Sequence, residues 1–107
     1  MKLWVDDIRP APSGWILAKN YHEAIAKLSM YDYDEVSLDH DLGDFDDDGQ
    51  ENTGYHIALF LAQRKQDRDL LPESLKFLIF VPKIVRCHSM NPIGLEKING
   101  VVERYLK

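Results

Sequence analysis

Short apolar runs alternate along the chain with longer segments whose apolar residues recur at helical spacing. The runs at residues 3–5, 15–18, 35–38 and 83–87 are typical of buried strands. The helical spacing covers residues 20–30, a segment that begins near residue 53, and residues 91–105. Strands that alternate with helices favour a parallel sheet wound with helices, so the pattern predicts an α/β protein.

Residues that can cap a helix precede each helical segment. Such residues satisfy the free backbone N–H groups of a first turn. Residues 67–76 fit neither pattern clearly, although Pro72 can begin a short helical segment. The capping candidates are Asn20, Thr53 or Asn52, and Asn91, which is followed by Pro92 at the first helical position.

Composition narrows the class of protein. A chain of 107 residues has room for one domain, which we expect to span residues 1–107. The formal net charge of -5 argues against non-specific binding to nucleic acid or to an anionic membrane. The single cysteine, Cys87, excludes an internal disulfide framework. No apolar run is long enough to cross a membrane, and no signal peptide is evident, so we expect a cytoplasmic protein.

Ionisable residues follow three of the predicted strands. Because the carboxyl ends of parallel strands share one edge of a sheet, we expect these clusters to form one site. Adjacent carboxylates repel each other unless a cation neutralises them, and hard oxygen ligands favour Mg²⁺, Mn²⁺ or Ca²⁺. The alternative is that each acid only caps a turn or a helix. The clusters are Asp6-Asp7, Asp39-His40-Asp41 and His88-Ser89.

Two histidines of these clusters are candidates for proton transfer. Imidazole titrates near neutral pH, and His40 and His88 each lie beside another candidate site residue. The alternative is a structural role for one or both. His22 and His56 lie within predicted helices and are interpreted as surface or boundary residues.

A possible phosphate site lies where the last helix begins. A helix that starts at Asn91-Pro92 leaves the N–H groups of Ile93 and Gly94 free to bind an anion. Gly94 would permit a ligand to approach the backbone closely. The alternative interpretation is a well-capped helix with no ligand.

The acidic segment at residues 44–52 resembles half of a calcium loop. Acids stand at alternate positions with Gly49 sixth, but Tyr55 occupies the position of the expected bidentate glutamate. We therefore interpret the segment as a solvated loop.

These strand-end residues resemble those of two-component receiver domains. In that fold an acid pair after the first strand and an aspartate after the third bind Mg²⁺, and the aspartate accepts a phosphoryl group; Asp6-Asp7 and Asp39 match these positions. Receivers also have a serine or threonine after the fourth strand, and Ser89 stands at that position in this chain. Three features depart from the pattern: residues 8–14 replace a helix, nothing after Ser89 supplies a fifth strand with a phosphate-contacting lysine, and His40 and His88 are present.

With these departures, the chain resembles a narrower family, the cyclic-phosphate-processing receiver-like domains, which are truncated relatives of receivers. The resemblance rests on four blocks in order: DDIRP at residues 6–10, LDHDLG at 38–43, TGY at 53–55 and HSMNPIG at 88–94. It implies a small receiver-like (flavodoxin-like) three-layer fold. The sheet would have four parallel strands in the order 2-1-3-4, counted along the chain, with helices on both faces.

The resemblance also implies metal-dependent hydrolysis of a cyclic phosphodiester, such as a nucleotide or an RNA-terminal 2′,3′-cyclic phosphate. A divalent cation, Mg²⁺ or Mn²⁺, would activate the phosphate and a water molecule. The alternatives are a phosphoryl-accepting receiver and a non-catalytic module that binds a nucleotide or protein. The expected metal ligands are Asp6, Asp7, Asp39 and Asp41, of which Asp41 could instead orient a histidine. The expected catalytic residues are His40, His88 and Asp39, and the expected phosphate-binding residues are Arg9, Ser89, Asn91 and Gly94.

Overall fold

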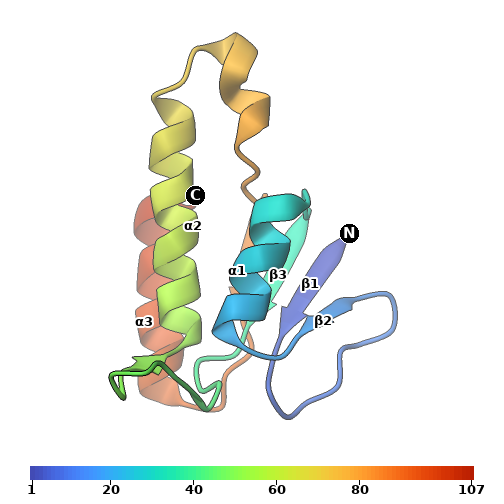
Figure 1. The fold of residues 1–107 in the computed structure, drawn as a ribbon, viewed down its shortest axis with the longest axis vertical. Coiled ribbons are helices and arrows are strands. Elements are labelled where there is room, and N and C mark those ends of the chain that lie inside the picture. Colours follow the sequence, from blue (N-terminus) through green and yellow to red (C-terminus); the bar gives the residue numbers. More distant parts are fainter.

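Four parallel strands form the central sheet, and their carboxyl ends meet at one edge (Figure 1). The computed structural model describes all residues from 1 to 107. Val5 lies opposite both Ala18 and Leu38, and Leu38 lies opposite Cys87, so all four strands end level with one another. The strands are β1 (Lys2–Val5), β2 (Ile16–Ala18), β3 (Glu35–Leu38) and β6 (Ile84–Cys87).

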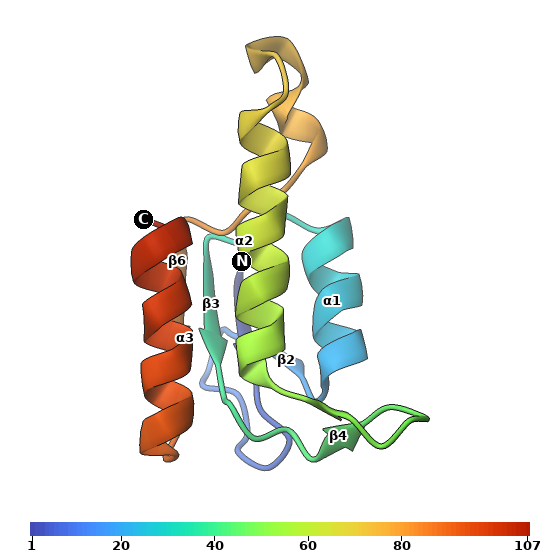
Figure 2. The same ribbon diagram turned by 90° about the vertical axis from the view of Figure 1, so that its left-hand side faces the viewer.

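Three α-helices cover a single face of this sheet (Figure 2). They are α1 (Tyr21–Met30), α2 (Gly54–Asp69) and α3 (Pro92–Tyr105), and α2 packs between the other two. The expectation of a three-layer fold with helices on both faces is therefore wrong. The connection between β1 and β2 contains no helix, and it is the only segment that passes over the other face.

The core lies between the sheet and the helix layer. Side chains alternate between the two faces of the sheet. Those that point to the helices, such as Leu3, Val5 and Leu38, are completely buried in one core with Ile57 and Ile98. The strand residues between them point to the face that no helix covers, here called the uncovered face, and several of these are more exposed. They include Lys2, Trp4, Ile84 and Arg86.

A small hairpin replaces part of the predicted polar loop. The strands β4 (Asp44–Phe45) and β5 (Glu51–Asn52) pair antiparallel to each other and do not join the main sheet. The prediction of four strands in the order 2-1-3-4 did not include this hairpin. The observed order is β2-β1-β3-β6, because the fourth strand of the parallel sheet is the sixth strand of the chain.

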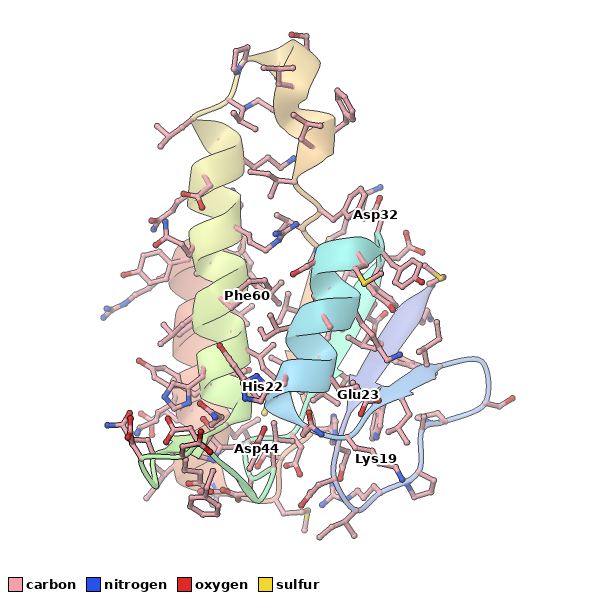
Figure 3. All side chains as sticks on the ribbon, viewed as in Figure 1. Lys19, His22, Glu23, Asp32, Asp44 and Phe60 are labelled. Carbon is pink, nitrogen blue, oxygen red and sulfur yellow. The ribbon has the colours of Figure 1, made fainter.

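Two acids of this hairpin, Asp44 and Asp46, have local structural partners. Asp44 lies below the first turn of α1 (Figure 3), and its Oδ2 accepts a 3.0 Å hydrogen bond from the Tyr21 N–H. Asp46 Oδ1 accepts hydrogen bonds from the N–H groups of Asp48 and Gln50. These two carboxylates therefore hold a helix start and a turn, as acids near free N–H groups do.

The ambiguous segment after residue 66 contains the end of α2 and a short 3-10 helix, η1 (Glu73–Leu78). Together with the end of α2, η1 projects beyond the sheet, at the end opposite the strand carboxyl ends (Figure 1). No helix of the chain is long and apolar enough to cross a membrane.

Candidate active site at the carboxyl edge of the sheet

Backbone hydrogen bonds extend the sheet one residue beyond its strands. The N–H groups of Asp6, Asp39 and His88 donate to the carbonyl oxygens of Ala18, Val5 and Leu38 respectively, at 2.9–3.0 Å. Each of the three ionisable residues is thereby held beside the next at the edge of the sheet. The prediction that the strand-end clusters converge is confirmed for these residues.

Three carboxylates meet at this edge. One oxygen from each of Asp6, Asp7 and Asp39 lies within 4.8 Å of the others. Gly43 passes close to this group with a positive φ of 59°, and a Cβ there would lie 3.3 Å from Asp7 Oδ2. A glycine suits this position, because side chains rarely adopt that backbone conformation.

Asp6 is the most buried member of the group, with 1% of its surface exposed. Its Oδ1 accepts hydrogen bonds from the N–H groups of Ile8 and Arg9, at 2.9 and 2.8 Å. Its Oδ2 lies 2.9 Å from His88 Nε2. Burial raises the pKa of Asp6, but these hydrogen bonds outweigh burial and hold the pKa below its ordinary value of 3.8. Asp6 is therefore a fixed anion.

His88 is held on both ring nitrogens and on one face. Nε2 contacts Asp6, Nδ1 lies 2.7 Å from Ser37 Oγ, and the ring stacks on Trp4 with centroids 3.7 Å apart. Burial lowers the pKa of His88 below its ordinary value of 6.5, although Asp6 opposes this. The neutral ring then donates from Nε2 to the carboxylate and accepts at Nδ1 from the Ser37 hydroxyl.

The pKa of Asp39 is shifted in the direction opposite to that of Asp6. Burial and the nearby charge of Asp6 raise the pKa of Asp39 above its ordinary value of 3.8. A carboxylate that resists ionisation beside another carboxylate is one that a bound cation would relieve.

His40 and Asp41 form a second group, next to the carboxylates. His40 Nδ1 donates to Asp41 Oδ1 at 2.9 Å, and Asn91 Nδ2 donates to Asp41 Oδ2 at 3.3 Å. Asp41 is not a member of the three-carboxylate group. The structure therefore supports its expected role in orienting a histidine rather than its expected role as a metal ligand.

Two glycines allow the helix starts to approach this group. A Cβ at Gly94 would overlap the His40 ring, and a Cβ at Gly54 would overlap the Asp39 carbonyl oxygen. The Gly54 N–H donates to the His40 carbonyl oxygen at 3.0 Å. The first turns of α2 and α3 thus pack directly against the segment that carries Asp39 and His40.

The expectation of free amides at the start of α3 is wrong. The N–H groups of Ile93 and Gly94 both donate to Asn91 Oδ1, at 3.1 Å, so the helix caps itself. Because Gly94 has no side chain, the His40 ring packs against its backbone. The sequence had predicted a bound phosphate at this place. The assignment of Asn91 and Gly94 to phosphate binding remains a prediction, without free amides to support it.

Arg9 and Ser89 retain donors for a ligand. Arg9 uses one guanidinium N–H on the His88 carbonyl oxygen, at 2.9 Å, and a guanidinium carries five such donors. Ser89 Oγ accepts from the Asn91 N–H at 3.0 Å, which leaves its own hydroxyl hydrogen free. Both residues are partly exposed beside the site.

The residues at this edge fit a divalent cation. Three carboxylates converge, and hard oxygen donors of this kind suit Mg²⁺ or Mn²⁺. Burial and the charge of Asp6 raise the pKa of Asp39, and a bound cation would oppose both effects. Asp6 accepts three hydrogen bonds, and a carboxylate has about four lone-pair positions, so one position is left for a ligand.

Sequence reasoning assigned no role to two residues of the site, Ser37 and Trp4. Both side chains point to the uncovered face, and Trp4 on β1 lies opposite Ser37 on β3. A serine in the middle of an apolar strand is a signal that could have indicated a buried hydrogen bond, because a buried hydroxyl needs a partner.

An acid pair after the first strand and a single aspartate after the third, on a parallel α/β sheet, define a receiver-like domain. More specifically, the chain belongs to the cyclic-phosphate processing receiver domain family, whose family model matches residues 1–104. The family resemblance inferred from the sequence is thereby confirmed. No curated protein and no solved structure was found to match the chain.

Proposed function

We propose that this protein is a metal-dependent phosphoesterase that opens a cyclic phosphodiester, in a nucleotide or at an RNA 2′,3′-cyclic phosphate end. The observation that carries the proposal is the convergence of Asp6, Asp7 and Asp39 within 4.8 Å, in a domain of the cyclic-phosphate processing family. These three residues would hold Mg²⁺ or Mn²⁺. Such a cation supplies Lewis-acid polarisation of a phosphoryl oxygen.

His40 is the residue best prepared for proton transfer. Its Nδ1–H is donated to Asp41, which leaves Nε2 unprotonated in the neutral ring and available to take a proton from an attacking water. After that step, Nε2–H can return the proton to the leaving ribose oxygen. His88 has no free ring nitrogen, so its part is to position Asp6.

Arg9 and Ser89 are suited to orienting the phosphate. The remaining guanidinium N–H groups of Arg9 can form a bidentate pair with two phosphate oxygens, and the Ser89 hydroxyl can donate to a third. The Arg9 backbone is itself fixed by its hydrogen bond to Asp6. Arg9 therefore lies on the same turn as Asp6 and Asp7, and Ser89 reaches the site from the end of β6.

The test is hydrolysis of a panel of 2′,3′-cyclic nucleotides with Mg²⁺ or Mn²⁺. We expect turnover to disappear with EDTA and in Asp39→Asn, and to fall about 10²- to 10⁴-fold in His40→Ala. The matched control is Asp47→Asn, which removes an exposed carboxylate that makes no hydrogen bond. Hydrolysis that survives both chelation and Asp39→Asn contradicts the proposal. Binding without turnover would favour the non-catalytic module instead.

A further inference from the structure

The largest hollow of the molecule does not lie at the carboxylates. It is a groove of about 540 Å³ along the solvent side of α2 and α3, which run side by side (Figure 2). Tyr55 and Leu59 of α2 form one wall, and α3 forms the other from Ile93 to Tyr105. At about 1.5 Å per residue, that wall is about 18 Å long.

One end of this groove adjoins the candidate active site. Tyr55 and Ile93 are each adjacent in the chain to a glycine, Gly54 or Gly94, whose missing side chain leaves room for Asp39 or His40. A ligand chain that leaves the phosphate at His40 can therefore enter the groove between the first turns of the two helices. At a rise of about 3.4 Å per stacked base, the groove has room for several nucleotides.

Gly100 keeps the middle of the groove open. It lies within α3, where a glycine weakens a helix relative to alanine. Its φ is not positive, and nothing lies within 4 Å of the position a Cβ would take. No packing or backbone requirement therefore explains a glycine here. Gly100 lines the groove and contributes no side chain that would fill it.

The groove carries the two kinds of side chain that bind single-stranded nucleic acid. Tyr105 supplies an aromatic face and is 43% exposed, whereas Tyr55 packs partly against the core. Lys97 lies 5.6 Å from the centre of the Tyr55 ring, and neither Lys97 nor Arg104 forms an ion pair with an acid. Aromatic platforms beside cations bind stacked bases and their phosphates.

We propose that this groove binds the nucleotides that precede a terminal cyclic phosphate, so that the ligand is single-stranded RNA rather than a free mononucleotide. This inference rests on the proposed function for the location of the phosphate end. Phosphates contact Lys97 and Arg104, and a base stacks on the exposed ring of Tyr105. Glu96, the one acid of the groove, faces the ligand as an acceptor for a base amino group.

The test measures the fluorescence anisotropy of a labelled single-stranded octaribonucleotide with a 3′-phosphate, which the enzyme cannot open. We expect Arg104→Glu and Tyr105→Ala to weaken binding at least about 5-fold. Gly100→Leu should fill the groove and weaken binding without loss of folding. The matched controls are Lys83→Glu and Tyr31→Ala, which change an exposed cation and a 49% exposed tyrosine elsewhere. Melting temperatures confirm that each variant is folded.

Equal affinity of all three groove variants and wild type overturns the inference, as does a wild-type protein that does not bind the oligonucleotide. A second arm compares kcat/KM for a cyclic mononucleotide and for an oligonucleotide with a 2′,3′-cyclic end. The ratio of oligonucleotide to mononucleotide should fall in the groove variants. If wild type opens neither substrate but binds the oligonucleotide through the groove, hydrolysis is refuted and the groove is supported.

Discussion

The side chain of His88 is the clearest example of a residue whose role depends on its neighbours. The sequence suggested a proton-transfer pair of His40 and His88. In the structure both nitrogens of His88 are engaged, by Asp6 and Ser37, whereas His40 has one nitrogen free. A ring that donates to a carboxylate ligand sets the orientation of that ligand. His88 is therefore best described as a positioning residue for Asp6.

The first prediction follows from this contact. We expect His88→Ala and Ser37→Ala to weaken Mn²⁺ binding about 10- to 100-fold, because Asp6 loses the partner that orients it. Isothermal titration calorimetry measures the affinity. His22→Ala, a change of an exposed histidine on α1, is the control. Unchanged Mn²⁺ affinity in both variants would show that Asp6 needs no support from His88.

At the level of elements, the first turns of α2 and α3 are shaped by the loop that they cover. Gly94 contacts the His40 ring, and Gly54 contacts the Asp39 carbonyl oxygen. Both helices also cap themselves locally, through Thr53 with His56 and through Asn91. The two helices therefore hold the segment that carries Asp39 and His40 against the sheet edge.

The second prediction compares two glycines of α3. Gly94→Ala should reduce the free energy of unfolding by about 1–3 kcal/mol, because its Cβ collides with a packed ring. Gly100→Ala should increase it by about 0.5–1 kcal/mol, because its Cβ meets only open space within a helix. Urea denaturation measures both. Equal effects of the two substitutions would contradict the contact between Gly94 and His40.

At the level of the whole molecule, one face of the sheet is left without helices. Trp4, Trp15 and His88 stack on that face next to the carboxylates, with the Trp rings 5.8 Å apart and edge to face. The uncovered face therefore supports the site directly, because Trp4 shields the His88 ring. Burial of that ring has a consequence for stability as a function of pH.

The third prediction concerns pH dependence in the presence of EDTA. The folded pKa of His88 lies below its unfolded value of about 6.5, so between the two values the unfolded chain binds a proton that the folded chain does not. Stability should therefore fall as the pH drops from 7.5 through 6.5, and level off below the folded pKa. Urea denaturation across this range should show a smaller fall in His88→Asn.

The two carboxylates contribute at lower pH and with opposite signs. The lowered pKa of Asp6 stabilises the fold above about 3.8, and this contribution disappears as the pH falls through the folded pKa. The raised pKa of Asp39 makes the folded state bind the extra proton, so its penalty decreases as the pH falls. Neither carboxylate makes the fold less stable as the pH falls from 7.5 to 6.5. An equal decrease in wild type and His88→Asn would therefore exclude His88 as its source.

The sequence by itself determined the class of fold and predicted the three members of the carboxylate group, although it also included Asp41, which lies outside that group. Alternation of strands and helices implies a parallel sheet, and acids that directly follow its strands must meet at one edge. These inferences need only local pattern and the geometry of parallel strands. The four motif blocks identified the family for the same reason, since each block is a continuous stretch of chain.

Only the tertiary structure decided the number of layers, the role of His88, the state of the α3 amides and the presence of the groove. His88 and Asp6 are 82 positions apart, and their contact depends on how strands β1 and β6 are placed around β3. The direction of the Asn91 side chain and the space above Gly100 likewise depend on packing. Contacts between distant segments are set by the whole arrangement of the chain, and no local pattern contains them.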